Sequence, residues 1–191
     1  VDHEWLLLEL SSFQLLGVQK FRPKISVLLN IYEAHLDYHK TFDNYQIAKS
    51  NIFRNQTEQD YFVYNADDPV IKSQLSKVNA KRVPFSTTET LLNGTWVDEK
   101  AIYYKQEHII DRKEIVLVGE HNLANILASV TVAKIIGVDN ASITKILTTF
   151  KGVKHRLQYV ANINERLFYN DSKATNILAT QKALRAFDQP I

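Results

Sequence analysis

Continuous apolar runs and helical repeats alternate through the first half of the chain. Runs such as ISVLLNI are rich in branched side chains, which is typical of strands buried on both faces of a parallel sheet. The alternation of such strands with helices favours an α/β layered fold. The expected strands cover residues 4–10, 25–31, 60–65 and 81–85, and the expected helices cover residues 41–55 and 69–78.

Residues 94–118 follow a different pattern. Short apolar stretches alternate with polar turns, and this arrangement predicts an antiparallel meander attached to the parallel sheet. The apolar stretches are residues 96–97, 102–104, 108–110 and 115–118, and the turns include residues 98–100 and 111–113.

Helical spacing returns after the meander. Apolar residues recur with a helical period over residues 123–136, with Asn122 as a candidate N-cap and Gly137 just past the end. Asp139 or Asn140 should then cap a second helix, which finishes at Gly152.

After Gly152 the pattern restarts, as expected for the first hairpin and helix of a new domain. We therefore predict two domains, residues 1–153 and 154–191, with the linker at 152–154. The hairpin is expected to use strands at 157–160 and 167–170 around a turn at 162–164, and the helix to cover about 176–187.

Composition narrows the class of protein. The 191 residues are 45% hydrophobic and 23% charged, which is ordinary for a globular chain. A net charge of +2 is too small to indicate a nucleic-acid partner. There are no cysteines, which excludes disulfides and thiolate zinc sites and fits a reducing cytoplasm. No apolar run approaches the ~20 residues of a membrane span, and no signal-peptide pattern occurs, so no membrane partner is expected.

The two ends of the sequence are unusual. The chain contains no methionine, and it runs from Val1 into an apolar stretch within a few residues. It ends at Ile191, just after an apolar periodic segment. We expect both ends to be cuts through a larger protein; a processed domain that lost its initiator is the alternative.

The segment NDSKATN at 170–176 lies between a predicted strand and a predicted helix. Ligands bind at this position in open α/β sheets, because backbone N–H groups and the helix dipole converge there. Asp171 and Lys173 add a carboxylate that suits a metal or a hydroxyl and a cation that suits phosphate. The alternative is a capped loop, with Thr175 or Asn176 as N-cap and a solvated lysine.

The segment ELSSFQ at 9–14 has the same placement. Glu9 ends an otherwise apolar strand, where a charge is costly without a partner or a metal. The hydroxyls of Ser11 and Ser12 and the amide of Gln14 follow it. A carboxylate that caps the next helix is the alternative.

His35, Asp37 and His39 follow the strand at 25–31. On an extended segment, this spacing would place three ligands on one face and suggest a zinc or iron hydrolase. A loop with solvated histidines is the alternative that we favour.

Lys49 lies on the apolar face of the helix predicted at 41–55. Tyr45, Ile52 and Phe53 are at i−4, i+3 and i+4 from it, so the lysine stem should be packed among them. A lysine in this position usually extends its amine to solvent. The alternative is an amine used in a site after a modification that removes its positive charge.

Arg156 follows His155 and the predicted linker. Arginine suits a bidentate grip on phosphate, although a single arginine is more often an ordinary surface residue. No Walker-type glycine loop occurs in this chain, which has five glycines.

Taken together, five motifs resemble the Mur ligase family and keep its order along nearly the whole chain. ELSSFQL and NDSKATN point to the family member that adds D-glutamate, and residues 80–118 are the least characteristic part. The motifs are ELSSFQL at 9–15, NIYEAHLDYH at 30–39, GEHNLAN at 119–125, HR at 155–156 and NDSKATN at 170–176.

The resemblance implies a fold. Members of the family have a UDP-binding domain, a central P-loop ATPase domain and a Rossmann-like C-terminal domain. Residues 1–153 would be the later part of the mostly parallel central ATP-binding domain, including the meander, and residues 154–191 the start of the C-terminal domain.

The resemblance also implies residue roles. Glu9 and His35 would hold magnesium beside the γ-phosphate, and Lys49 aligns with a lysine that is carbamylated in the family and supports a second magnesium ion. Together these three would be the catalytic and metal-binding residues. The implied substrate-binding residues are Ser11, Gln14, His35 and Thr175, and the implied ATP-binding residues are Asn122, Asn125, Arg156, Asp171 and Lys173.

The implied activity is ATP-dependent addition of D-glutamate to UDP-N-acetylmuramoyl-L-alanine through an acyl-phosphate, in cytoplasmic peptidoglycan precursor synthesis. The full-length enzyme would be a monomer that uses ATP and two Mg²⁺ ions. ATP, the acyl-phosphate and a carboxylate substrate crowd negative charge into one cleft, which two magnesium ions and a basic pair would offset.

Two departures from the family pattern stand out. Ala34 replaces an aspartate that commonly precedes the histidine of the second motif, so no role is assigned to that carboxylate. Because the P-loop is absent, we predict that residues 1–191 alone bind ATP weakly and do not ligate. The competing hypotheses are a related amide ligase such as folylpolyglutamate synthase, a non-enzymatic α/β binding module and a metallohydrolase.

Overall fold

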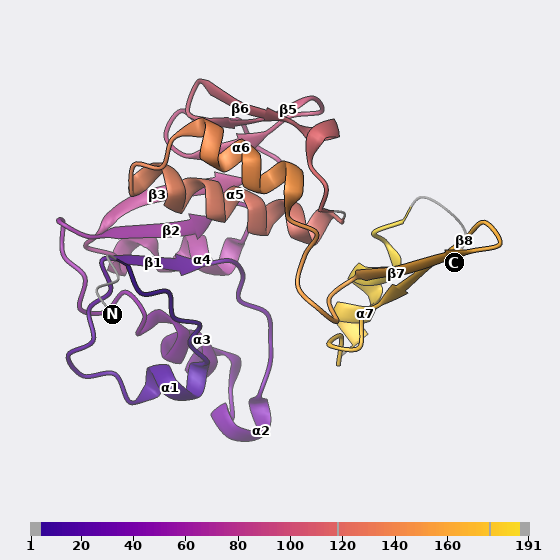
Figure 1. Ribbon diagram of the computed structural model, residues 1–191. Helices are drawn as coiled ribbons and strands as arrows, with labels where there is room; N and C mark the ends of the chain where they lie inside the picture. The colour runs from indigo at the N-terminus through magenta and orange to yellow at the C-terminus, as the bar shows by residue number, and fades with distance from the viewer. Residues whose placement is uncertain (1–4, 118, 176, 188–191) are drawn as a thin grey trace. The chain divides into compact units, whose positions relative to one another are not determined.

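The computed structural model describes residues 5–117, 119–175 and 177–187. They form two compact units, residues 1–83 and 84–191, and each unit is described by itself. Six strands form one sheet in the order β1-β2-β3-β4-β5-β6, and two more form the hairpin β7-β8 (Figure 1). An α/β fold with a mostly parallel sheet and an antiparallel meander is therefore confirmed.

The first unit is built on the parallel pair β1 (Ile25–Leu28) and β2 (Tyr61–Asn65), in which Ile25 is opposite Tyr61. Its helices are α1 (Ser12–Leu16), α2 (Leu36–His39), α3 (Phe42–Ser50), α4 (Pro69–Gln74) and the 3₁₀ turn η1 (Leu75–Lys77). The core of the unit consists of apolar side chains from the strands and helices, namely Leu28, Ile31, Tyr45, Phe53, Phe62, Ile71, Val78 and Ala80.

Asp68 joins a helix start to the loop after β1. Its Oδ1 accepts hydrogen bonds from the backbone N–H groups of Val70 (2.9 Å) and Ile71 (3.0 Å), and so caps α4. Its Oδ2 accepts one from the Ile31 N–H at 2.9 Å. The buried carboxylate therefore uses both oxygens to fix backbone at the carboxyl end of β1.

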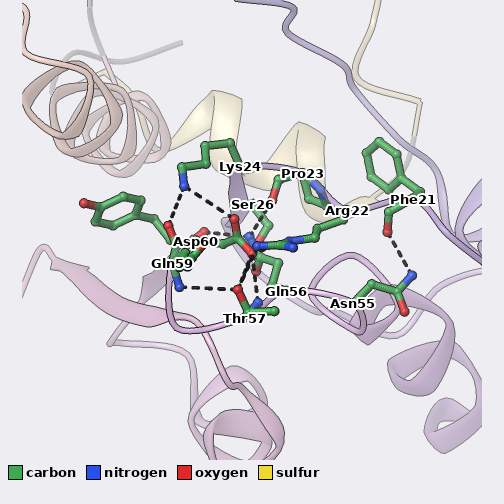
Figure 2. A network of polar contacts seen from close by, with 11 residues as sticks. Phe21, Arg22, Pro23, Lys24, Ser26, Asn55, Gln56, Thr57, Gln59 and Asp60 are labelled. Carbon is green, nitrogen blue, oxygen red and sulfur yellow. Dashed lines mark hydrogen bonds and ion pairs between the residues drawn. The ribbon is translucent and has the colours of Figure 1, made fainter.

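A second buried carboxylate, Asp60, lies at the opposite end of the strands, just before β2 (Figure 2). Its Oδ2 is 2.7 Å from Arg22 Nε and accepts a 2.8 Å hydrogen bond from the Thr57 N–H. Lys24 Nζ is 3.7 Å from Oδ1 and donates to the Gln59 carbonyl at 2.6 Å. The Arg22 guanidinium is the main reason that the pKa of Asp60 falls to about 2. We call this group the Asp60 clasp.

The second unit contains the end of β3 (Lys81–Ser86), then β4 (Thr95–Val97), β5 (Ala101–Tyr104), β6 (Glu107–Asp111) and the 3₁₀ turn η2 (Arg112–Glu114). The β3–β4 pair is parallel, while β4–β5 and β5–β6 are antiparallel, as predicted for the meander.

Gly94, just before β4, is required by packing. Its φ of +144° disfavours other residues, and a Cβ there would lie 2.0 Å from the Pro84 carbonyl oxygen.

Two helices follow the meander, α5 (Glu120–Ile135) and α6 (Asn140–Thr149). The buried hydroxyls of Thr131 on α5 and Thr95 on β4 form a 2.7 Å hydrogen bond, which ties the helix to the meander. Asp139 caps α6 by accepting from the Ser142 N–H at 2.8 Å, which confirms one of the two predicted caps. Gly137 follows α5 with a left-handed φ of +84°, as expected.

The last elements are β7 (Gln158–Ile163), β8 (Arg166–Asn170) and α7 (Ile177–Leu184). The hairpin is antiparallel and turns through Asn164 and Glu165, whose φ values are +51° and +63°. The turn thus lies slightly later than predicted. The predicted domain boundary at 153/154 stays a prediction.

Five sequence predictions of secondary structure are wrong. Residues 5–10 form no strand, and Leu6 and Leu7 are 81% and 94% exposed, because a strand needs a hydrogen-bonded neighbour that the described residues do not supply. Residues 115–117 are also not a strand. Glu4, Val118 and Asn176, which also figured in predictions, lie outside the described residues.

The other three errors concern helix ends. The α3 helix ends at Ser50 and continues as i→i+3 turns, such as Phe53 N–H to Ser50 O at 3.2 Å. The N-cap of α5 is Gly119, not Asn122. Helix α6 ends at Thr149, three residues before Gly152. Within the described ranges, no helix combines the length and apolar character needed to cross a membrane.

Candidate functional site

Ser11 and Gln14 form a capping box at the start of α1. The Ser11 hydroxyl accepts from the Gln14 N–H at 3.3 Å, and the Ser11 N–H donates to Gln14 Oε1 at 2.8 Å. The helix is therefore capped by Ser11 and not by the Glu9 carboxylate. Both predicted substrate residues are exposed, and each has a structural role at the helix start.

His35 begins α2 in an unusual backbone conformation. Its φ and ψ are 55° and 36°, the left-handed region, and its side chain makes no capping hydrogen bond. The ring is exposed and meets Phe13 edge-on at a centroid distance of 5.1 Å. Non-glycine residues in this region are uncommon and tend to occur at functional sites.

His39 differs from both sequence interpretations of the His-x-Asp-x-His segment. The segment is not extended, because Leu36–His39 is a helical turn that places His39 in the core at 5% exposure. His39 Nε2 is 3.0 Å from the hydroxyl of the buried Ser12. Among the described residues there is no group of three or more histidine, aspartate, glutamate or cysteine side chains that could hold a metal. The metallohydrolase hypothesis is therefore unsupported.

Lys49 lies in the last turn of α3 with Tyr45 buried one turn before it and Phe53 buried one turn after it. Burial lowers the pKa of its amine, and the carboxylate of Glu9 partly opposes that shift. The structure therefore brings Glu9 and Lys49 within electrostatic range. No described residue makes a hydrogen bond or close ion pair with the Lys49 amine.

Asn122 and Asn125 lie in the first two turns of α5. Asn122 is half-buried and Asn125 is exposed, so the amide of Asn125 is available to a ligand. The Asn125 carbonyl accepts from the Ser129 hydroxyl at 2.8 Å within the helix.

The HR and NDSKATN motifs, which are separate in sequence, meet in the second unit. Asp171 Oδ1 accepts from the Leu157 N–H at 3.0 Å, and the Lys173 N–H donates to the His155 carbonyl at 3.2 Å. Asn170 Nδ2 is 3.2 Å from His155 Nδ1. The antiparallel β7–β8 pairing causes this meeting, because it places the start of one strand beside the end of the other.

This meeting brings together the backbone segments that carry two exposed cations, Arg156 and Lys173. Arg156 lies between His155 and Leu157, whose φ values of +67° and +42° are both left-handed. Within the described residues, the side chains of Arg156 and Lys173 have no ion-pair partner. Thr175 lines a shallow hollow together with Ala174, Ile177, Thr180 and Gln181. The arrangement suits an anionic ligand.

The comparisons with known proteins agree with these motifs. The family model described as the Mur ligase middle domain matches residues 1–133. The chain belongs to the Mur ligase family. Three curated relatives are each called UDP-N-acetylmuramoylalanine--D-glutamate ligase. Those of Geobacillus sp. (strain WCH70) and Geobacillus kaustophilus (strain HTA426) are 59% identical over 97% and 96% of this chain. That of Bacillus mycoides (strain KBAB4) is 53% identical over 100% of it.

This Mur ligase chain spans about two fifths of those relatives, which it covers to 41%, 41% and 42% of their length. Solved structures share the fold. MurF from Acinetobacter baumannii matches with a TM-score of 0.73 and 23% identity, over 89% of this chain and 38% of that one. The MurF ligase from Thermotoga maritima matches with a TM-score of 0.66 and 22% identity, over 86% and 39%.

Proposed function

We propose that this chain is part of an ATP-dependent ligase that adds D-glutamate to UDP-N-acetylmuramoyl-L-alanine during cytoplasmic peptidoglycan precursor synthesis. The observation that carries the proposal is the 59% identity over 97% of the chain to a protein of that name. The motifs that resemble the D-glutamate-adding member, ELSSFQL and NDSKATN, lie at the two sites described above.

Lys49 is proposed to act as a carbamate. Its amine is partly buried and its pKa is lowered by that burial, so more of it is neutral than in an ordinary lysine. The neutral amine attacks carbon dioxide, a C–N bond forms, and one proton is released to water. The product is a carboxylate on a lysine stem, which removes the cost of leaving a positive amine half-buried.

The residues present fit magnesium. Mg²⁺ prefers oxygen ligands, keeps several waters and is usually bound through one or two protein carboxylates together with substrate phosphates. Glu9 would supply one such carboxylate and carbamylated Lys49 another, since the charge of Glu9 acts on the Lys49 amine. His35, on the exposed start of α2, would hold a water or a substrate oxygen beside them. When bound, magnesium neutralises charge on the transferred phosphoryl group.

The second unit would supply the grip on the nucleotide. Arg156 can make a bidentate contact with phosphate, and Lys173 provides a second positive charge. Asp171 holds the backbone N–H of Leu157 and so sets the path of the chain at Arg156. Asn125, with Asn122, would contact the base, and Thr175 would contact the amino-acid substrate at its shallow hollow.

In the proposed reaction the substrate carboxylate takes the γ-phosphoryl group of ATP. The amine of D-glutamate then attacks the acyl-phosphate carbon, phosphate leaves, and the amine loses one proton. The role of the chain is to position these anions and offset their charge, because phosphoryl transfer depends mainly on positioning and electrostatics.

The test uses the full-length protein that contains this chain. Phosphate release is measured with ATP, Mg²⁺ and UDP-N-acetylmuramoyl-L-alanine, and with D-glutamate, L-alanine, L-lysine or diaminopimelate as the acceptor. Release and a new amide product are expected with D-glutamate alone. Turnover with a different amino acid, and none with D-glutamate, would overturn the proposal.

A further inference from the structure

Helices α1 and α2 are joined by one buried polar contact. Ser12 and His39 are 3% and 5% exposed, and their Oγ and Nε2 atoms are 3.0 Å apart. Ser12 follows Ser11 at the start of α1, and His39 ends the turn that His35 begins. The contact therefore joins the segment of Glu9 and Ser11 to the segment of His35.

The backbone of His39 continues the connection to α3. Its carbonyl accepts from Asn44 Nδ2 at 2.9 Å and from the Thr41 N–H at 2.9 Å, so His39 fixes the first turn of the helix that carries Lys49. At the other end of α3, Asn51 Nδ2 donates to the Leu15 carbonyl of α1 at 3.1 Å. Helix α1 is thus held to α3 directly and through His39.

Aromatic rings surround the His39 ring and reach His35. Phe13 stacks on His39 at a centroid distance of 5.4 Å and meets His35 edge-on at 5.1 Å. Tyr45 of α3 and Tyr38 of α2 meet His39 edge-on at 5.3 and 5.2 Å. Phe13 of α1 contacts both histidine rings, so the angle of the His35 ring depends on where α1 is held.

Packing alone does not explain a histidine here. A phenylalanine would fill a similar space but leave the buried Ser12 hydroxyl without its partner, which is unfavourable. The imidazole ring fills the space among the aromatic side chains, and its Nε2 atom makes the directional hydrogen bond to Ser12. The hydrogen bond adds a directional constraint between α1 and α2 that an apolar contact of the same shape would lack.

We propose that His39 is a positioning residue, which acts through its hydrogen bond to Ser12 to hold Glu9, His35 and Lys49 in working geometry. This inference rests on the proposed function, in which Glu9, His35 and Lys49 form the metal site. It concerns a buried residue that the sequence analysis had placed among metal ligands or solvated histidines.

The test compares variants of the full-length protein. His39→Phe keeps the ring and removes the hydrogen bond, whereas His39→Gln keeps a polar group that can reach Ser12. Ser12→Ala removes the other partner, and His39→Phe combined with Ser12→Ala leaves no unpaired hydroxyl. Thermal unfolding reports stability, while the Mg²⁺ concentration for half-maximal activity and Mn²⁺ binding measured by electron paramagnetic resonance without turnover report geometry.

His39→Phe is expected to raise both metal constants about tenfold, as expected for misplacement of a site by a fraction of an ångström. His39→Gln should stay within about twofold of the wild type. The double variant should regain the stability lost by His39→Phe while its metal constants stay raised, because the orphaned hydroxyl is gone but the link is still missing.

If the metal constants follow stability in every variant, His39 is a core residue only and the proposal fails. A nuclear magnetic resonance signal from the His35 ring separates this failure from that of the proposed function. A wild type without ligase activity would overturn the function, yet a His35 resonance that shifts in His39→Phe and returns in His39→Gln would still support the positioning role. An unchanged resonance in His39→Phe would overturn that role.

Discussion

Two charged groups in the first unit, Asp60 and Lys49, have opposite environments. In the Asp60 clasp, the carboxylate has Arg22, Lys24 and the Thr57 N–H around it, with contacts of 2.7 to 3.7 Å. Lys49 is also partly buried, yet within the described residues no group closer than the long-range charge of Glu9 balances it. The fold satisfies one buried charge completely and leaves the other unsatisfied.

The difference separates structural charge from available charge. A satisfied charge stabilises the fold and offers nothing to a ligand. A buried charge without a partner destabilises the fold, so proteins keep such a charge mainly where it serves a function. For this reason titratable groups with perturbed pKa values concentrate at functional sites. Arg22 and Arg156 repeat the contrast, since Arg22 is bound to Asp60 and Thr57, while Arg156 is exposed in a strained segment.

The largest expected effect comes from removing the unsatisfied lysine. Lys49→Ala in the full-length protein should lower kcat by at least about 100-fold, because it removes the carboxylate of the proposed carbamate, which would stabilise developing charge. Acetate or formate should restore part of the activity. Lys72→Ala is the matched control, since Lys72 occupies the last turn of α4 as Lys49 does in α3. Full activity in Lys49→Ala would show that the unpaired charge of Lys49 has no catalytic use, so it would not differ in function from the paired charge of Asp60.

Removing the exposed arginine should have the next largest effect. Arg156→Ala is expected to raise KM for ATP about 10- to 100-fold, corresponding to a charge-assisted contact of roughly 1.5–3 kcal/mol. Arg156→Lys should recover only part of this, because lysine lacks the planar fork. Arg166→Ala, in the first position of β8, should leave KM unchanged. An equal effect from both arginines would indicate general charge and not a phosphate contact.

Breaking the Asp60 clasp is expected to lower stability and to leave catalysis unchanged. Asp60→Asn should lower the free energy of unfolding of the first unit by about 1–3 kcal/mol near neutral pH, since a satisfied carboxylate is lost. The pKa of Asp60 lies at about 2, below its ordinary 3.8, so its contribution is present above pH 3.8 and disappears as the pH falls towards 2. Hydrogen exchange of β2 amides measures it.

Asp43→Asn, at an exposed position in the first turn of α3, serves as the control for the clasp. It should keep the wild-type change in exchange protection between pH 4 and pH 2, whereas Asp60→Asn should flatten it. A wild-type pH dependence in Asp60→Asn would show that the clasp does not stabilise the strands.

The smallest effect is expected at the capping box of α1. There Ser11 caps the helix and is also proposed to contact the substrate. Ser11→Ala should cost about 1 kcal/mol through the lost cap, while Ser11→Asn should keep the cap. If Ser11 also contacts the muramoyl substrate, KM for that substrate rises in both variants. A normal KM in Ser11→Asn would leave Ser11 with the capping role alone.

Much of the fold could be predicted from patterns because β1 and β2 are apolar runs, and such runs are typical of buried strands. The prediction at residues 5–10 failed for a physical reason, since an apolar run records that a segment is suited to burial but not what covers it. The early end of α3 and the Gly119 cap depend on local hydrogen bonds that periodicity does not contain.

The candidate site was predicted unevenly. Residue types at the ends of expected strands indicated Glu9, Asp171 and Lys173 as candidates, although residues 5–10 form no strand. The spacing of Tyr45 and Phe53 correctly indicated that Lys49 is partly buried. The meeting of His155 with Lys173 depends on the register of the β7–β8 hairpin, which no single motif contains. The burial of His39 was missed, although the apolar Phe42 lies three residues after it in the sequence.

The left-handed backbone conformation of His35 determines which mutations at this position the fold tolerates. Besides glycine, asparagine and aspartate are the residues that best tolerate this conformation, and each is a single base change away from a histidine codon. Such mutations would remove the imidazole without straining the chain. Alleles with His35→Asn or His35→Asp should therefore yield protein of normal abundance that lacks the side chain, and cellular quality control would not eliminate it.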